Sequence, residues 1–205
     1  MSNRHNRKYG VSRRLGVNLW GREKDPFARK NSPPGAHGAT LGYKRSTDYG
    51  MQLKAKQKLK FYYYMSEKQF KLMYQEAKRL KGDTSENLVG LLESRLGSFV
   101  YRSKIAPTPF AARQIVNHCH VMINGKIVNK PNYILKPGDV VTVRDSSKNI
   151  PMILQSLESE NRSLPEYIQW NNKETSATYL KVPNFAEVPY PCLQEPSLVV
   201  QLYSR

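Results

Sequence analysis

The stretch from residue 121 to 128 constrains the fold more than any other part of the chain. Two short apolar runs, Val121–Ile123 and Ile127–Val128, flank the pair Asn124-Gly125. A two-residue turn of type I′ needs positive φ at both positions, which asparagine and glycine adopt readily. The pattern therefore predicts a β-hairpin, and it excludes an all-helical chain.

A helix is predicted before this hairpin and another strand after it. Thr108 can cap a helix that holds Pro109 in its first turn and ends near Asn117, since threonine is a favoured N-cap and proline fits the first helical turn. The turn signal Pro137-Gly138-Asp139 precedes the apolar run Val140–Val143. We therefore expect a compact module of a helix and short strands over about residues 93–150.

Upstream of this module the chain has the spacing of amphipathic helices. One helix is predicted near residues 52–64, where at least one of three successive tyrosines should pack in a core. Ser66 and Gln69 form a capping-box pattern at the start of a second helix. A third helix should begin near Asp83 and continue to Phe99 with one apolar face. The fold class is therefore α+β. The basic residues of the second helix lie mostly off its apolar stripe: Lys68, Lys71, Lys78 and Arg79.

Beyond residue 150 the apolar pattern is less regular. Residues 151–205 hold 4 basic and 6 acidic side chains, so the local charge is slightly acidic. Residues 198–203 have the composition of a strand, but the run is short enough to be a packed helix. The sequence leaves these two alternatives open.

The basic charge is concentrated near the N-terminus. The chain has 33 Lys and Arg against 16 Asp and Glu, a formal charge of +17, and residues 1–60 hold 15 basic and 3 acidic side chains. Such a surplus favours a polyanionic partner over a small neutral substrate. Residues 1–50 also lack a periodic apolar face, so we expect an irregular basic extension that a partner orders. Removing residues 1–45 should then leave the rest folded.

Several classes of protein are excluded by composition and spacing. Cys119 and Cys192 are the two cysteines, too few for a disulfide framework or a four-cysteine zinc site. The chain has neither a signal-peptide stretch nor an apolar run of the roughly 20 residues that span a bilayer. His118-Cys119-His120 lacks further ligands at zinc spacing and a third group to orient a nucleophile. We expect no metal, cofactor, catalytic site, small-molecule substrate or membrane, and a reducing compartment such as the cytoplasm.

Residues 112–126, Pro131-Asn132-Tyr133 and Lys136–Asp139 together resemble a known RNA-binding module. It is the small domain named after protein four of the small ribosomal subunit, which also occurs in some tRNA synthetases, pseudouridine synthases and a heat-shock RNA-binding protein. The module alone therefore implies RNA binding and no more.

This sequence departs from the usual pattern of the module at three positions. Pro109 stands where arginine is usual, Cys119 where glycine is usual and Asn132 where serine is usual. The first change removes one expected RNA contact. Cys119 would carry a strain of about 1 kcal/mol if it ends the helix in the left-handed conformation.

The flanks resemble the bacterial-type family of ribosomal protein four nearly from end to end. The segments that carry this resemblance are Arg13–Gly16, Pro33–Gly38, Gln52–Phe61, Asn87–Leu96 and Tyr203–Arg205. The resemblance implies the irregular basic extension over residues 1–50, a largely helical domain of residues 51–87 plus 190–205, and an inserted RNA-binding domain of residues 88–189.

The resemblance also implies the partners. Members of this family bind a multi-helix junction in the 5′ region of 16S rRNA early in assembly of the 30S body. They lie beside ribosomal protein five, near the path by which mRNA enters, and that interface affects translational accuracy. A cytoplasmic ribosome is expected, and a bacterial-type organelle ribosome is compatible. The alternative is a free RNA-binding factor or RNA chaperone built on the same module, although such factors are shorter and lack the Pro-Pro-Gly and Tyr-Ser-Arg flanks.

The residues expected to contact RNA lie in three regions of the chain. Arg113 can form a two-pronged contact with phosphate, while Gln114 and two histidines offer hydrogen bonds at the end of a helix. The lysines of residues 54–60 and the basic extension would neutralise phosphate, although a lysine run is often only a solvated face. The predicted contacts are Arg7, Lys8, Arg13, Arg14, Arg22, Lys44, Arg45, Lys54, Lys56, Lys58, Lys60, Arg113, Gln114, His118, His120, Asn124 and Lys126.

Overall fold

The computed structural model of the chain describes residues 8–22, 25, 27, 29–41, 47–159, 162–172 and 174–204. The chain divides into two compact units. Residues 1–85 and 190–205 form the first, here called the helical unit, and residues 86–189 form the second, here called the inserted unit.

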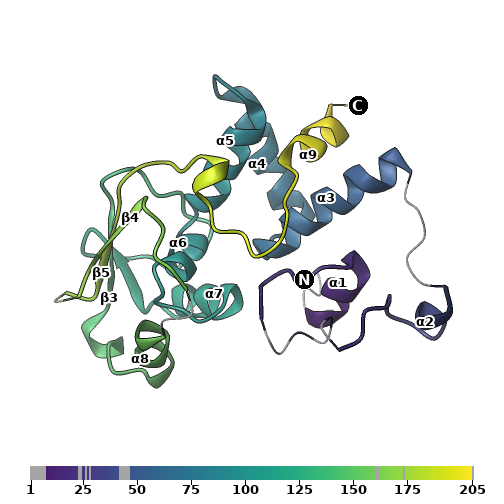
Figure 1. Cartoon of the computed structure of the whole chain (residues 1–205). Helices are drawn as coiled ribbons and strands as arrows, with labels where there is room; N and C mark the ends of the chain where they lie inside the picture. Colours follow the sequence, from purple (N-terminus) through teal and green to yellow (C-terminus); the bar gives the residue numbers. More distant parts are fainter. Residues whose placement is uncertain are drawn as a thin grey trace. The chain divides into compact units, whose positions relative to one another are not determined.

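The helical unit is built from helices packed around aromatic and aliphatic side chains. Three of these helices lie side by side, α3, α4 and α9 (Figure 1). Tyr74 of α4 stacks on Tyr203 of α9 with 4.6 Å between the ring centroids. The bounds of the helices are α1 (Lys8–Leu15), α2 (Gly38–Leu41), α3 (Asp48–Tyr62), α4 (Glu67–Arg79) and α9 (Pro196–Tyr203).

Local capping fixes where α3 and α4 begin. The Thr47 hydroxyl accepts a hydrogen bond from the backbone N–H of Gly50, so α3 begins a few residues before the predicted position. The Ser66 hydroxyl accepts from the backbone N–H of Gln69, as the capping pattern predicted for α4. Tyr62 and Tyr63 are both buried, which confirms that at least one of the three tyrosines belongs to the core.

The inserted unit combines helices with a five-stranded antiparallel sheet of strand order β2-β1-β3-β5-β4. One face of the sheet packs on helical side chains, and Phe99, Ile115, Val141 and Tyr179 are fully or almost fully buried there. The predicted α+β fold is confirmed. The elements are α5 (Thr84–Glu93), α6 (Leu96–Arg102), α7 (Pro109–Asn117), β1 (Val121–Ile123), β2 (Lys126–Ile127), β3 (Val140–Val143), α8 (Pro151–Glu158), β4 (Ile168–Asn171) and β5 (Ser176–Tyr179), with 3-10 turns η1 (Asp145–Ser147) and η2 (Phe185–Glu187).

The predicted helix and hairpin of this unit are confirmed at the level of single residues. The Thr108 hydroxyl caps α7 by accepting from the backbone N–H of Ala111, and Pro109 occupies its first turn. Asn124 and Gly125 have φ of 48° and 78°, the positive values that a type I′ turn requires.

The single helix predicted up to Phe99 is wrong, because a loop divides it into α5 and α6. Arg95 is extended, with ψ of 136°, and forms an isolated β-bridge with Ile134. The backbone N–H of Leu96 donates to the carbonyl of Tyr133 at 2.8 Å. The segment that pairs with this break, around Tyr133 and Ile134, lies almost 40 residues further along the chain. Helical spacing in the sequence could therefore not reveal the break.

The structure shows the conformation of the two ends of the chain and decides between the two alternatives that the sequence left open for residues 198–203. Among the described residues of 1–50, α1 and α2 are helical, and the segments around them have turns and bends rather than regular structure. Residues 198–203 belong to a helix, α9, since Pro196 occupies its first turn and Val199 is fully buried. The strands β4 and β5, which lie in the weakly patterned region after residue 150, were not predicted.

Candidate nucleic-acid interface

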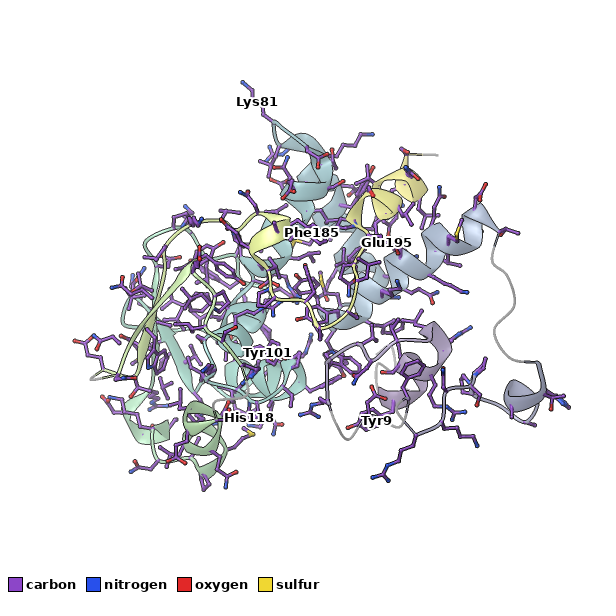
Figure 2. All side chains as sticks on the ribbon, viewed as in Figure 1. Tyr9, Lys81, Tyr101, His118, Phe185 and Glu195 are labelled. Atoms are coloured by element: carbon purple, nitrogen blue, oxygen red, sulfur yellow. The ribbon has the colours of Figure 1, made fainter. Side chains whose placement is uncertain are left out.

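Four of the predicted contacts lie between the middle of α7 and the start of β1. The apolar side of α7 is buried in the core, which leaves Gln114 exposed and Arg113 half-buried on its outer side. His118 follows the last turn of α7 and is exposed (Figure 2). The His118 and His120 rings lie 6.0 Å apart between centroids.

The chain conformation after α7 directs these side chains. Cys119 has φ of 61°, so it ends the helix in the left-handed conformation, the position at which glycine is usual in the module. The Nδ1 atom of His120 lies 2.8 Å from the Ser147 hydroxyl, which fixes the orientation of the imidazole ring. We call the four polar residues that follow one another from the middle of α7 to the start of β1 the cluster at the α7 end: Arg113, Gln114, His118 and His120.

The remaining predicted contacts of this unit lie at the other end of β1. The Asn124 amide group donates to the Asp139 carboxylate at 2.9 Å, and its side-chain oxygen accepts from the backbone N–H of Val140 at 2.9 Å. Asn124 therefore ties the hairpin turn to the turn before β3, which is a structural role. Lys126, beside it, is exposed. The structure does not bring these two residues together with the cluster at the α7 end.

The predicted lysines of α3 are paired with carboxylates of the same chain. Lys56 and Lys60 contact the two oxygens of Glu67 at 2.6 and 2.9 Å, and Lys58 contacts Glu195 at 3.3 Å. The side chains of these three lysines are only 12–15% exposed. Lys54, the fourth predicted lysine, is half-buried.

The basic residues near the N-terminus fall into different environments. Arg13 donates from Nε to the Ser32 carbonyl at 3.0 Å and from Nη2 to the Pro33 carbonyl at 3.1 Å, so it organises the neighbouring turn. Arg14 is exposed, and Arg22 is half-buried. Three predicted contacts, Arg7, Lys44 and Arg45, and the side chain of Lys8 lie outside the described residues.

The turn organised by Arg13 explains one of the motifs seen in the sequence. A Cβ atom added to Gly38 would lie 2.0 Å from the Pro33 carbonyl oxygen, far inside any real contact. The Pro33–Gly38 segment therefore needs glycine for a close approach of backbone to backbone.

Glu67 joins α3, α4 and α9 of the helical unit through its contacts with Lys56, Lys60 and Tyr203. Burial by itself raises the pKa of the Glu67 carboxyl, but the hydrogen bonds from Lys56 and Lys60 outweigh burial and lower this pKa to about 2. The Tyr203 hydroxyl also donates to Glu67 at 3.1 Å, and burial together with the Glu67 charge raises the pKa of Tyr203.

These contacts predict a loss of stability in acid. The ordinary pKa of a glutamate, 4.5, applies to the unfolded chain, whereas the folded value is about 2. The unfolded state therefore takes up the proton first, so the contribution of Glu67 is present above pH 4.5 and is lost as the pH falls towards 2. Urea unfolding of the helical unit should show this loss as a lower free energy of unfolding in acid. In the Glu67→Gln variant the free energy of unfolding should vary less over the same pH range. An equal acid dependence in both proteins would contradict the assignment.

The described residues hold no group of three or more His, Cys, Asp or Glu side chains that could bind a metal ion. In the same part of the chain, every helix is too short or too polar to cross a membrane.

The matched family models divide the chain near the start of α6. Residues 3–93 match the ribosomal protein S4/S9 N-terminal domain, and residues 94–141 match the S4 domain. A curated relative from Phenylobacterium zucineum, "Small ribosomal subunit protein uS4", is 55% identical over 205 residues that cover all of both chains. The chain belongs to the uS4 family. Proteins of the same name from Paramagnetospirillum magneticum and Ehrlichia canis are 53% and 50% identical, over 100% and 97% of this chain and 100% and 98% of their own lengths.

Membership of the uS4 family states the general role of the chain and the location of its RNA-binding domain. Proteins of this family are structural constituents of the ribosome, so the chain is not an enzyme. The S4 domain, an RNA-binding domain, covers α6, α7 and the first strands of the sheet. The cluster at the α7 end and the hairpin turn with Lys126 both lie within it.

The predicted contacts omitted one set of basic side chains that the structure exposes. Lys68, Lys71 and Lys78 of α4 are all exposed. Their positions off the apolar stripe that contains Phe70 and Tyr74 were the signal that could have added them.

Proposed function

We propose that this protein binds 16S rRNA as a structural component of the small ribosomal subunit. The observation that carries the proposal is the match of residues 94–141 to the S4 domain, in which Arg113 and Gln114 lie in the middle of α7 and His118 and His120 follow its last residue. A buried apolar side holds α7 on the sheet, so these polar groups extend from a rigid platform. Arginine suits phosphate because its planar fork donates two parallel hydrogen bonds.

The finer role follows from the resemblance noted in the sequence. The protein binds a multi-helix junction in the 5′ region of 16S rRNA and nucleates assembly of the 30S body. It contacts ribosomal protein five of the small subunit, lies near the path of mRNA, and contributes to translational accuracy. The formal charge of +17 supports a polyanionic partner, and the curated relatives are named as proteins of the small ribosomal subunit.

Replacing Arg113 by alanine should weaken binding to the 5′ domain of 16S rRNA by about 10-fold to 100-fold. A hydrogen bond between charged groups contributes roughly 1.5–3 kcal/mol, and each 1.4 kcal/mol is tenfold in affinity. Filter binding at a fixed salt concentration measures the change. Lys181→Ala is the matched control, because it removes one positive charge from the same unit at an exposed residue that already pairs with Glu187. Equal affinities for the two variants would count against the cluster at the α7 end.

Sedimentation separates a ribosomal constituent from a free RNA-binding factor. A constituent should be stoichiometric in 30S particles from a cell lysate and nearly absent from the supernatant. A free factor built on the same domain would remain mostly unbound or bind in substoichiometric amounts. The same fractions, taken from the bacterial cytoplasm, test the proposed location of the protein.

A further inference from the structure

One face of α4 displays basic side chains along the length of the helix. Lys68, Lys71 and Lys78 are exposed, whereas Phe70 and Tyr74 point into the core. At 100° per residue the three lysines fall within one arc of about 80° that lies beside the buried stripe, and at 1.5 Å per residue they span about 15 Å of the helix axis. We call these three residues the α4 lysine stripe.

The α4 lysine stripe differs from the α3 lysines in its pairing. Lys56, Lys58 and Lys60 contact Glu67 or Glu195, but no ion pair among the described residues includes a lysine of the stripe. Positive charge that is not neutralised by a carboxylate of the same chain is therefore more accessible to a partner on α4 than on α3.

The two acidic residues of α4 already form ion pairs within the chain. Glu67 accepts from the α3 lysines, and Glu76 pairs with Arg79 one turn further along, 2.7 Å between Oε1 and Nη2. The hydrogen bond from Arg79 lowers the pKa of Glu76, so this carboxylate stays charged and paired. A partner must therefore supply the anions for the stripe.

We propose that the α4 lysine stripe is a second rRNA-binding surface of this protein, one that contacts phosphates of the RNA backbone. The inference rests on the proposed function and adds to it a surface outside the S4 domain. Lysine is a flexible point charge that suits phosphate better than the edge of a base. Leu72 of α4 is also exposed and would suit a protein partner, but the three unpaired ammonium groups of the stripe favour a polyanion.

The salt dependence of binding tests the stripe. The full chain and a triple variant, Lys68→Gln with Lys71→Gln and Lys78→Gln, are titrated with the 5′ domain fragment of 16S rRNA at several salt concentrations. Each phosphate contact contributes about 0.7–0.9 to the slope of log affinity against log salt, so the triple variant should have a slope smaller by about 2 to 3. The matched triple change to arginine keeps charge and helix propensity, and it should keep the slope of the unchanged protein.

Lysine acetylation followed by mass spectrometry gives a direct second reading. In the free protein the stripe should react faster than Lys56 and Lys60, because the latter are mostly buried and ion-paired. Addition of the rRNA fragment should protect the three stripe lysines.

The outcomes separate the stripe from the proposed function. If the unchanged chain does not bind the fragment, the proposed function itself is wrong. If it binds, but the glutamine triple variant has the same slope and the stripe lysines are not protected, the stripe is not an RNA surface. A variant that keeps full rRNA affinity yet fails to enter 30S particles would assign the stripe to a protein partner and would also overturn the proposal.

Discussion

Replacing Glu93 by alanine should lower the free energy of unfolding of the inserted unit by about 3–5 kcal/mol. The Glu93 side chain is fully buried, and that of its partner Arg102 is 7% exposed. Arg102 donates to both carboxylate oxygens, from Nη2 to Oε1 at 2.8 Å and from Nε to Oε2 at 3.1 Å. The Tyr167 hydroxyl also donates to Glu93, at 3.0 Å. The alanine variant would leave a buried guanidinium without this carboxylate, which is the costly part of the change.

The position of the tryptophans allows each unit to be followed separately. The chain has two tryptophans, one in each unit: Trp20 lies in the helical unit and Trp170 in the inserted unit. In a Trp20→Phe background, Trp170 fluorescence during urea unfolding reports the inserted unit, and Glu93→Ala should move its midpoint to lower urea. Glu76→Gln, which breaks an ion pair on the surface of the helical unit, should leave the midpoint unchanged.

A double variant tests whether the buried charge is the reason for the loss. Glu93→Leu with Arg102→Met removes both charges, and it should recover much of the stability that Glu93→Ala loses. If the double variant is as unstable as the single one, loss of packing rather than an unpaired charge would explain the effect. An unchanged midpoint for Glu93→Ala would show that the ion pair contributes nothing.

Replacing Trp20 by alanine should destabilise the helical unit by a similar amount, about 3–5 kcal/mol, as expected for a large aromatic side chain removed from a core. Trp20 is 6% exposed and its neighbour Leu19 is fully buried. The indole N–H of Trp20 also donates to the Tyr62 carbonyl at 3.4 Å, so the substitution removes a hydrogen bond at the end of α3 as well.

Far-UV circular dichroism should show the helical signal of this unit lost at lower urea in Trp20→Ala. Trp170 fluorescence should keep its midpoint, because that residue belongs to the inserted unit. Tyr49→Ala is a suitable control, since Tyr49 is an aromatic residue of the same unit with 54% of its surface exposed. Equal stability of the two variants would mean that the Trp20 segment is not part of the core.

The burial of Trp20 bears on the expectation that residues 1–45 can be removed while the rest of the chain stays folded. The low apolar content of the segment suggested that only a partner orders it. The structure instead places Leu19 and Trp20 in the core of the helical unit. We therefore expect removal of residues 1–45 to expose apolar surface and weaken this unit, while the inserted unit stays folded.

The features that could be predicted from the sequence depend on interactions between near neighbours. Thr108 caps a helix whose first turn begins with the next residue, and Asn124-Gly125 sets a turn by its own backbone preferences. The helix break at Arg95 could not be predicted, because it depends on hydrogen bonds from a distant loop. Strands β4 and β5 were missed for a different reason, since each alternates between apolar and polar residues over a run of only four residues, which is too short to stand out.

In the candidate interface, too, features set by neighbouring residues could be predicted and features set by distant contacts could not. The cluster at the α7 end follows from the helix and its left-handed last residue, both of which the sequence indicates. The pairing of Lys58 with Glu195 joins residues 137 positions apart and could not be foreseen from a run of lysines (Figure 2 labels Glu195). Spacing thus identified which residues are basic and outward-facing, but not which of them the chain already neutralises.

The insertion of one unit within the other sets an order of events during translation. Residues 86–189 are synthesised before α9, whose Tyr203 stacks on Tyr74 and whose preceding residue Glu195 holds Lys58. Domains generally fold as units while the chain grows, so the inserted unit can fold while the helical unit still waits for its last helix. A nascent chain would then present its S4 domain first, and the helical unit would be completed only after α9 has been synthesised.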